Sequence, residues 1–381
     1  MKKKILFGAG LYGRLALAKY GKESVAYFVD NNENLVGQYI EDIEIISFET
    51  LKKIYKSYSI VITTKYRHSI AKQLKENGMI GYSYYYEKGE RYYPTNELVV
   101  NPYQDEVAEY LDNSHQGIQQ KIRDIDMEVE QLYNSSNLFN HIEIETINRC
   151  NGNCSFCPVS VKNDRREFHE MSDDLFKSII DQLSEMKYEG RLALFSNNEP
   201  FLDKKIVERH KYAREKCPHA RMHLFTNGTL LKIEQFTEII NYLDELVIDN
   251  YNQKLELLET SKKIKEYCEQ HPELRDKVTI ILRKPREVLT NRGGDAPNRK
   301  AEECYPNAKC TLPFKQLIVR PNGMVSLCCN DALGTYSLAD LNKETLIEAW
   351  NNPRFQMVRK CLYAGRKNWK KCKKCDVFNI G

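Results

Sequence analysis

The stretch CNGNCSFC at residues 150–157 places three cysteines, Cys150, Cys154 and Cys157, within eight residues. One loop can hold all three thiolates around a single metal centre at this spacing. Thiolates select zinc or iron-sulfur clusters, and a structural zinc ion needs four protein ligands, whereas no fourth cysteine or histidine follows at finger-like spacing. The stretch therefore predicts a 4Fe-4S cluster with one iron left open to a cofactor or substrate.

The residues around this stretch alternate between strand-like and helix-like patterns. Residues 142–146 read as a strand, and strand-like runs recur at 192–195, 222–225, 246–248 and 278–282, separated by amphipathic stretches. Such alternation predicts a parallel sheet wrapped by helices. In sheets of this class, ligands bind at the carboxyl ends of the strands.

The pattern CxxxCxxC, with the aromatic Phe156 before its last cysteine, resembles the signature of the radical S-adenosylmethionine (SAM) superfamily. The resemblance runs from about residue 142 to the C-terminus. It implies a partial (β/α)6 barrel in which Cys150, Cys154 and Cys157 hold the cluster and the free iron chelates SAM. It also implies that an electron from the cluster breaks a carbon-sulfur bond, and that the 5'-deoxyadenosyl radical formed removes a substrate hydrogen atom.

Further segments resemble the cofactor-binding turns of the superfamily. SNNEP at 196–200 resembles its Gly-Gly-Glu-Pro turn, with two asparagines in place of the glycines. Asparagine tolerates positive backbone φ well, so we expect the turn to be kept. TNG at 226–228 resembles a second turn, and an arginine at the end of the fifth strand is expected to meet the methionyl carboxylate. The expected cofactor contacts are Phe156, Asn197, Asn198, Glu199, Thr226, Asp249 and Arg283. For the last two, an ordinary turn and a solvated side chain are the alternative.

The C-terminal cysteines resemble the SPASM/twitch extension, which binds auxiliary 4Fe-4S clusters. PNGM at 321–324 supplies the turn of its expected β-hairpin. Members with seven cysteines hold two clusters, whereas the shorter set here is expected to hold one auxiliary cluster. Its expected ligands are Cys310, Cys328, Cys372 and Cys375. The roles of Cys304, Cys329 and Cys361 stay open, and zinc suits the four-cysteine set equally well by spacing alone.

A glycine-rich loop, GAGLYG, occupies residues 8–13 after a strand-like run, and Asp30 closes the next run. In this context Gly8, Gly10 and Gly13 let the backbone approach a phosphate, and Asp30 accepts a ribose hydroxyl. The unit resembles short nucleotide-binding-like domains attached to sugar-modifying enzymes, which implies a nucleotide or nucleotide-sugar ligand. A full NAD site draws on two such halves, so a docking or structural role is the alternative.

These patterns predict an α/β protein of four parts. They are a Rossmann-like unit at 1–100, a helical connector at 101–140, the partial barrel at 141–300 and a small SPASM/twitch domain at 301–381.

Composition narrows the class of protein further. The net charge of +4 does not favour nucleic-acid binding, and no apolar run approaches the roughly 20 residues that span a bilayer. The apolar run after the basic N-terminus ends at once in the glycine loop, so we expect a cytoplasmic protein. Twelve cysteines then indicate metal ligation, because disulfides seldom persist in the cytoplasm.

The resulting prediction is hydrogen abstraction from a small polar substrate, such as a sugar or nucleotide-sugar, leading to oxidation, epimerisation or rearrangement. Reduced flavodoxin or ferredoxin is the electron donor that the resemblance implies. One alternative is a maturase of a ribosomal peptide, and another is a non-catalytic metal-binding scaffold. The sequence identifies no catalytic acid or hydrogen donor.

Overall fold

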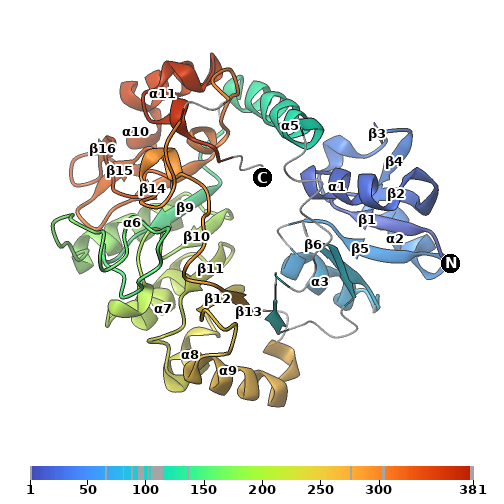
Figure 1. The fold of residues 1–381 in the computed structure, drawn as a ribbon, viewed down its shortest axis with the longest axis horizontal. Helices are drawn as coiled ribbons and strands as arrows, with labels where there is room; N and C mark the ends of the chain where they lie inside the picture. Colours follow the sequence, from blue (N-terminus) through green and yellow to red (C-terminus); the bar gives the residue numbers. More distant parts are fainter. Residues whose placement is uncertain are drawn as a thin grey trace. The chain divides into compact units, whose positions relative to one another are not determined.

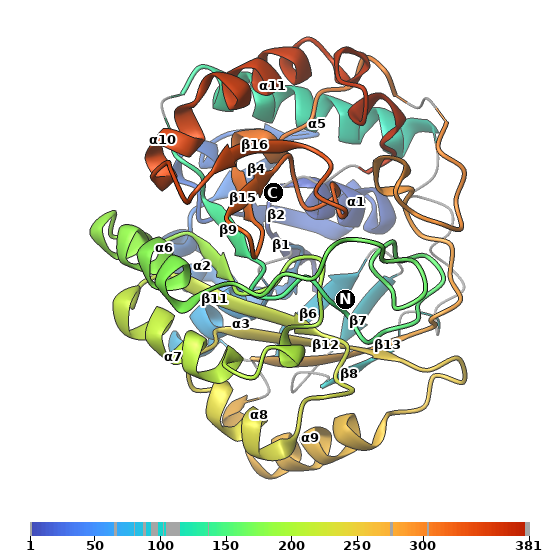
Figure 2. The same cartoon turned by 90° about the vertical axis from the view of Figure 1, so that its left-hand side faces the viewer.

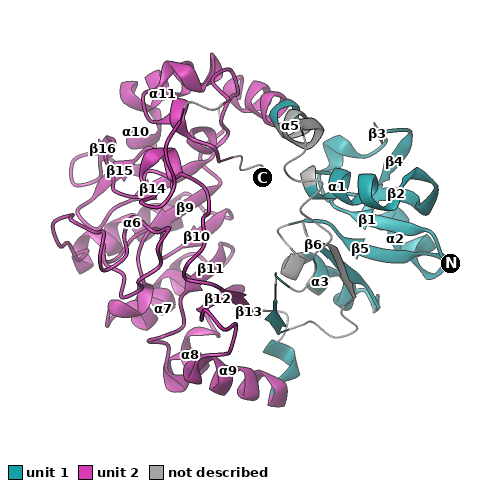
Figure 3. Cartoon of the chain, in the orientation of Figure 1, with its two compact units in different colours: residues 1–124, 271–276, 380–381 teal, residues 125–270, 277–379 magenta. Residues whose placement is uncertain are grey.

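The structure is a computed structural model that describes residues 2–64, 67–79, 81–86, 89–92, 98–101, 103, 115–135, 137–274, 277–302 and 305–377. The chain forms two compact units, shown in Figure 3: residues 1–124 with 271–276 and 380–381, and residues 125–270 with 277–379. The predicted barrel and the predicted C-terminal domain therefore share one unit. Cys304 lies outside the described residues.

The first unit is built on a sheet with the strand order β3-β4-β2-β1-β5-β6-β7 (Figure 1). Strands β4, β2, β1, β5 and β6 run parallel, while β3 and β7 pair antiparallel at the edges. This is the order of the doubly wound nucleotide-binding fold, so the predicted Rossmann-like architecture is present. The elements are β1 (Lys4–Phe7), α1 (Leu11–Tyr20), β2 (Val25–Val29), β3 (Tyr39–Ile40), β4 (Ile43–Ile46), α2 (Phe48–Ile54), β5 (Ser59–Ile62), α3 (Arg67–Glu76), β6 (Ser83–Tyr86), β7 (Gly89–Tyr92) and the short β8 (Val99–Val100).

Alternation along β1 explains how this sheet is covered on both faces. Ile5 and Phe7 point into a core with Leu51 of α2, whereas Leu6 between them points into a second core with Leu17 of α1. Successive side chains of a strand face opposite sides, so one apolar strand feeds both cores.

The second unit is a curved sheet in which β9 to β13 are parallel and follow one another in sequence (Figure 2). Strand β14 pairs parallel to β9 on the other side and continues into the antiparallel strands β15 and β16. The elements are β9 (His141–Ile144), α6 (Asp173–Glu185), β10 (Arg191–Ala193), α7 (Ile206–Lys216), β11 (Arg221–Thr226), α8 (Ile233–Ile239), β12 (Glu245–Tyr251), α9 (Glu259–Gln270), β13 (Val278–Arg283), β14 (Gln316–Val319), β15 (Met324–Ser326), β16 (Ser337–Asp340), α10 (Leu346–Asn351) and α11 (Pro353–Tyr363). The predicted partial barrel is confirmed, and its sixth parallel strand comes from the C-terminal region.

Helices α6 to α9 lie along the outer face of this sheet (Figure 2). Helix α6 shows why: Phe176, Ile179 and Leu183 recur at helical spacing and are buried, which gives the helix one apolar face. The Ser172 hydroxyl accepts a hydrogen bond from the Leu175 backbone N–H and so caps the first turn. The helices leave the carboxyl ends of the strands open for a site.

The predicted hairpin turn joins β14 to β15. Gly323 has a φ of 84°, where a side chain would be strained, and the Asn342 amide donates to the Asn322 carbonyl behind it. Because β14 also pairs with β9, this hairpin joins the C-terminal region to the barrel.

Helix α5 (His115–Tyr133) occupies part of the predicted connector, while residues 104–114 of that region lie outside the described residues. Among the helices of the described residues, none combines the length and the apolar character needed to cross a membrane.

Candidate functional site

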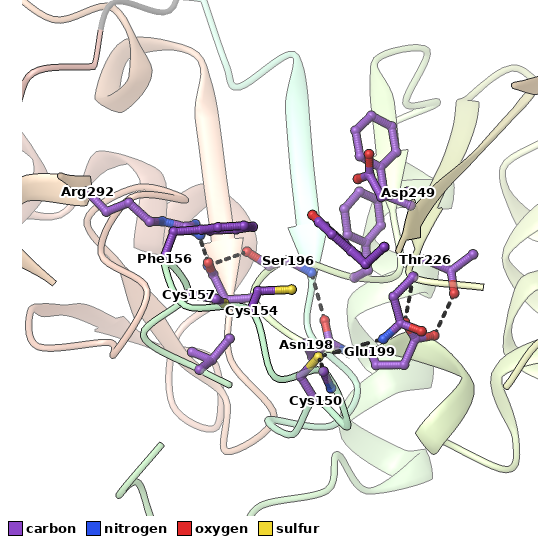
Figure 4. A pocket seen from close by; sticks show the side chains of 17 residues that line it. Cys150, Cys154, Phe156, Cys157, Ser196, Asn198, Glu199, Thr226, Asp249 and Arg292 are labelled. Atoms are coloured by element: carbon purple, nitrogen blue, oxygen red, sulfur yellow. Dashed lines mark hydrogen bonds between the residues drawn. The ribbon is translucent and has the colours of Figure 1, made fainter. Parts of the chain in front are cut away.

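The three cysteines of the loop after β9 line one cavity of about 220 Å³ (Figure 4). Burial raises the pKa values of Cys150 and Cys154 to about 12. The thiols are thus protonated near neutral pH unless a metal replaces the protons. A donor set of three soft thiols beside open space fits an iron-sulfur cluster better than a hard cation. Among the described residues, no three His, Cys, Asp or Glu side chains converge on a position for a single metal ion.

Gly152 keeps the space between these thiols free. A Cβ atom there would lie 3.3 Å from the Cys150 Sγ and 4.0 Å from the Cys154 Sγ. The Gly152 backbone N–H also donates to the Cys150 Sγ at 3.2 Å. A backbone without a side chain can therefore approach the metal-binding sulfurs closely, a role that the sequence analysis missed.

Glu199 ties the turn after β10 to the turn after β11. Its carboxylate accepts hydrogen bonds from the Thr226 hydroxyl at 2.7 Å, the Asn227 N–H at 2.8 Å and the Phe201 N–H at 3.1 Å. Burial raises the pKa of Glu199, and these hydrogen bonds oppose the shift. Glu199 and Thr226 both line the cavity, as predicted for cofactor-binding residues, and they shape its wall together.

The two asparagines of this turn have different surroundings. Asn198 Oδ1 accepts from the Ser196 N–H, whereas its Nδ2 is buried without a partner among the described residues. The Asn197 amide donates to the carbonyl of Cys329 at 3.0 Å. Neither asparagine has a positive φ, so the expected use of asparagine's tolerance for that region is wrong.

Asp249 and Arg283, two predicted cofactor contacts, differ in their position relative to the cavity. Asp249 lines the cavity, whereas Arg283 is not among the lining residues and donates from Nε to Asp249 Oδ1 at 3.3 Å. Burial raises the pKa of Asp249, and the positive charge of Arg283 opposes that shift. Phe156 lines the same part of the cavity, with its ring centroid 6.0 Å from that of Tyr251.

Arg292 is the arginine that reaches the cavity, and the sequence analysis missed it. It enters from the side opposite the Glu199–Thr226 pair (Figure 4). Its Nη2 donates to the Asn197 side chain and to the Cys329 carbonyl at 3.1 Å, while its Nε has no partner among the described residues. Its φ of 50° is strained for arginine, and such strain clusters at functional sites. The signal in the sequence was the pair of glycines directly after it.

Aromatic rings form another part of the wall. Phe195 and Phe225 stack at 14° with their centroids 5.3 Å apart, and both line the cavity. Phe225 is partly exposed to that space. A flat apolar face next to polar groups suits a ring that carries hydroxyl groups.

The four C-terminal cysteines of the predicted set lie close to one another. The pKa of Cys328 is raised well above its usual value by burial and then by neighbouring thiols, first Cys329 and then Cys372, Cys310 and Cys375. Burial also raises the pKa of Cys372 and brings that of Cys375 to about 11. Cys328 and Cys372 are buried and Cys310 and Cys375 are part-buried, and a group of four such cysteines fits a metal cluster that compensates the charge of the thiolates.

Two of the cysteines with open roles have distinct surroundings. After burial, the strongest effect on the pKa of Cys329 comes from Glu143 inside the barrel, and the value reaches about 12. Cys361 is part-buried on α11 and is not among the thiols that act on Cys328.

The glycine loop of the first unit is explained by its own packing. A Cβ at Gly13 would lie 2.0 Å from the Gly8 carbonyl oxygen, and Gly8 has a φ of 119°. The Asp30 carboxylate accepts from the Ala9 and Asn32 backbone N–H groups at 2.8 and 2.9 Å. Around Gly10 a Cβ would meet nothing within 4 Å. Nucleotide binding by this loop stays a prediction.

Two family models match the chain. The radical SAM superfamily model matches residues 144–279, and the model of an iron-sulfur cluster-binding domain, SPASM, matches residues 310–376. The chain is similar to the S-adenosyl-L-methionine-dependent 2-deoxy-scyllo-inosamine dehydrogenase of Niallia circulans, with 29% identity over 247 residues, 64% of this chain and 95% of that protein. It is also similar to the crystal structure of BtrN in complex with AdoMet and 2-DOIA, with a TM-score of 0.55 and 26% identity over 64% of this chain and 95% of that one.

These matches cover the barrel with its three-cysteine loop and the C-terminal region with its four-cysteine group. The chain is therefore a member of the radical SAM superfamily, an enzyme that uses SAM and iron-sulfur clusters and carries a C-terminal SPASM domain.

Proposed function

We propose that this enzyme oxidises a secondary alcohol on a small polar ring, a sugar or an aminocyclitol, to a ketone. The observation that carries this proposal is that the cavity is lined both by the three-cysteine loop and by residues bonded to Cys329, the neighbour of Cys328 in the sequence. One wall holds the three-cysteine loop, and the other holds Asn197 and Arg292, both bonded to the carbonyl of Cys329. The relative named as a dehydrogenase supports the direction of the reaction.

We assign the cluster next to SAM to Cys150, Cys154 and Cys157, and the auxiliary cluster to Cys310, Cys328, Cys372 and Cys375. When bound, these groups supply a 5'-deoxyadenosyl radical and an acceptor for one electron. The soft donors and the burial of several of them support both assignments, and the space left by Gly152 supports the first.

The chain itself holds the substrate ring. Asn198 Nδ2 and Arg292 Nε are the cavity's unpartnered buried donors among the described residues, so hydroxyl groups of a substrate would satisfy them. The stacked Phe195 and Phe225 rings offer a flat surface to the C–H face of the substrate. Fixing the reacting carbon in this way supplies orientation and excludes water.

Three finer parts of the proposal extend beyond the cavity. We propose reduced flavodoxin or ferredoxin as the electron donor, in a cytoplasmic setting that keeps the thiols reduced. A nucleotide-sugar is a second substrate class, supported by the doubly wound order of the first unit. Asp249, Phe156 and Glu199 are proposed SAM contacts because they line the cavity, whereas Arg283 does not line it and its Nε pairs with Asp249.

The test is anaerobic turnover of the reconstituted enzyme with SAM and dithionite. The substrates are 2-deoxy-scyllo-inosamine, a panel of aminocyclitols and UDP-sugars deuterated at their carbinol carbons, and a pool of short peptides. We expect deuterium in 5'-deoxyadenosine and one equivalent of ketone from a cyclic alcohol. Label from the peptide pool alone, or 5'-deoxyadenosine without any ketone, would contradict the proposal.

A further inference from the structure

A carboxylic acid is buried directly behind the wall of the cavity. Glu143 on β9 is 7% exposed, and the Ser196 hydroxyl, which lines the cavity, donates to Glu143 Oε2 at 2.6 Å. Ile142 and Ile144 are fully buried and point to the opposite face of β9, so Glu143 faces the inside of the barrel. Apolar side chains usually fill that space.

The other oxygen of Glu143 is held by fixed donors. Gln316 Oε1 accepts from the Cys329 N–H at 3.3 Å, so its Nε2 is the end that donates to Glu143 Oε1 at 2.8 Å. The same Nε2 lies 3.3 Å from His141 Nδ1, which makes Nδ1 the acceptor and places the imidazole proton on Nε2, 3.6 Å from Glu143 Oε1. Oε2 is thus the oxygen that remains oriented toward Ser196 and the cavity.

The surroundings bring the pKa of Glu143 close to neutral. Burial raises it to about 7, against the opposing effect of the Ser196 hydrogen bond. The positive charges that also oppose the shift are those of Arg320, Arg191 and Arg292. Burial lowers the pKa of His141 to about 3 and also lowers that of His223. Glu143 can therefore take up and release a proton near pH 7 while both imidazoles stay neutral.

We propose that Glu143 is the proton acceptor of the oxidation and that Ser196 relays the proton from the substrate hydroxyl. This rests on the proposed alcohol oxidation. The reacting C–H bond loses its hydrogen atom to the 5'-deoxyadenosyl radical, and the substrate O–H bond breaks as its proton moves to Ser196 Oγ. The proton of Ser196 moves to Glu143 Oε2, and one electron leaves to the auxiliary 4Fe-4S cluster as the C=O bond forms.

The proton and the electron leave on the same side of the cavity. Gln316 links Glu143 to the backbone of Cys329, and the charge of Glu143 acts on the Cys329 thiol. Cys328, a proposed ligand of the auxiliary cluster, is the next residue. Protonation of Glu143 removes a negative charge beside the group that receives the electron, so the two transfers favour each other.

The first experiment needs no turnover. Infrared difference spectra of the anaerobic holoenzyme are recorded as a function of pH for the wild type, Glu143→Gln and Glu245→Gln. Glu245 is the matched control because it pairs with Arg191 at 3.7 Å at the start of β12, the strand end far from the cavity residues Asp249 and Tyr251. We expect a protonated-carboxyl band that titrates near pH 7, persists in Glu245→Gln and disappears in Glu143→Gln.

The second experiment uses turnover of 2-deoxy-scyllo-inosamine, or of whichever cyclic alcohol the panel shows to be oxidised. We expect Ser196→Ala and Glu143→Gln to lower kcat for ketone formation about 100-fold, the low end for loss of an acid–base group, with KM changed less than about threefold. Ser196→Thr keeps the hydroxyl and should retain most of the rate. Deuterium transfer into 5'-deoxyadenosine should continue in Glu143→Gln, so that less ketone forms per 5'-deoxyadenosine.

The pH profile separates a proton acceptor from a structural residue. Ketone formation by the wild type should rise through an apparent pKa near 7, and this rise should be absent in Glu143→Gln. An unchanged profile in that variant, a neutral-pH band that survives it, or full activity of Ser196→Ala would overturn the inference. If no cyclic alcohol is oxidised by the wild type, the proposed function fails instead, and the infrared band still decides whether Glu143 titrates as stated.

Discussion

Gly152 shows how one missing side chain shapes the cysteine loop. An added Cβ would lie 3.3 Å from the Cys150 Sγ, closer than ordinary van der Waals contact. Gly152→Ala should displace this ligand and lower the iron bound per chain after anaerobic reconstitution. Gly10→Ala is the control, because a Cβ there meets nothing within 4 Å. Equal iron content in both variants would show that the loop adjusts without loss.

A substitution in either cysteine group should remove one cluster, but the two substitutions should affect the reaction differently. With two 4Fe-4S clusters the enzyme holds about eight irons, so Cys154→Ala and Cys372→Ala should each lose about four. Cys154→Ala should also abolish SAM cleavage, whereas Cys372→Ala should still release 5'-deoxyadenosine but form no ketone. Cys268→Ala, a change at a buried cysteine of α9, should keep all the iron. Colorimetric iron assay and chromatography of the nucleoside products measure these outcomes.

For single residues of the cavity, the sequence predicted those that belong to a motif. It missed those whose position depends on how distant segments come together in the fold. Cys154, Glu199 and Thr226 follow recognisable spacing and all line the cavity. Arg292 is marked in the sequence only by the two glycines after it, and Ser196 only by its place before the Asn-Asn-Glu-Pro turn, because the positions of both side chains depend on strand ends that meet only in three dimensions. Arg283 ends a strand as expected and its Nε donates to Asp249, while its predicted contact with the methionyl carboxylate stays a prediction.

At the scale of elements, a buried charged group joins β9 to β14. Glu145 is fully buried and lies 2.9 Å from Arg320 Nη1 and 3.8 Å from Arg166 Nη1. Its other oxygen accepts from the Asn197 N–H at 3.2 Å, so the same carboxylate also positions the turn after β10. Neighbouring strands and a cavity wall thus depend on one side chain.

Removing this charge should destabilise the second unit strongly. Glu145→Gln leaves the buried Arg320 guanidinium without its carboxylate, which costs about 3 kcal/mol or more of the free energy of unfolding, while Arg166 keeps its pair with Asp164 at 2.8 Å. Asp181→Asn breaks an exposed pair with Lys216 and should cost less than about 1 kcal/mol. Denaturant unfolding followed by circular dichroism gives both values. A Glu145→Gln cost as small as that of the control would mean that water or a neighbour replaces the lost charge.

The parallel strands β9 to β13 were predictable because their apolar runs alternate with amphipathic helices. Strand β14 was foreseen as part of a hairpin, but not as the partner of β9. The sequence of residues 316–319 does not specify which edge of the barrel this strand joins. An apolar strand can pair with any nearby sheet edge whose main-chain N–H and C=O groups are unpaired.

At the scale of the whole molecule, the SPASM region and the barrel are one folding unit. Because β14 pairs with β9, a chain that ends at residue 300 would leave β9 as an exposed sheet edge with its main-chain groups unpaired. We expect such a chain to aggregate or to lose its cooperative thermal transition, as calorimetry and light scattering would report. A soluble, cooperatively folding truncated chain would show that the barrel closes without β14.

The boundary predicted near residue 300 falls inside the second compact unit. Composition separates the cysteine-rich end from the barrel, so the sequence predicts a boundary near residue 300. The contacts place residues 277–379 with 125–270 in one unit, because strand pairing crosses that boundary. The Rossmann-like class of the first unit was predicted from its βαβ pattern, whereas its strand order is known from the structure.

The pairing of β9 with β14 also bears on how the enzyme is made. About 170 residues separate the two strands. A ribosome that adds roughly 5–20 residues per second takes roughly 10–30 s to synthesise them. During that interval Cys150, Cys154 and Cys157 are already synthesised, whereas the barrel still lacks β14. We therefore expect the proteins that deliver iron and sulfide either to act after the chain leaves the ribosome or to protect these thiols until β14 has been made.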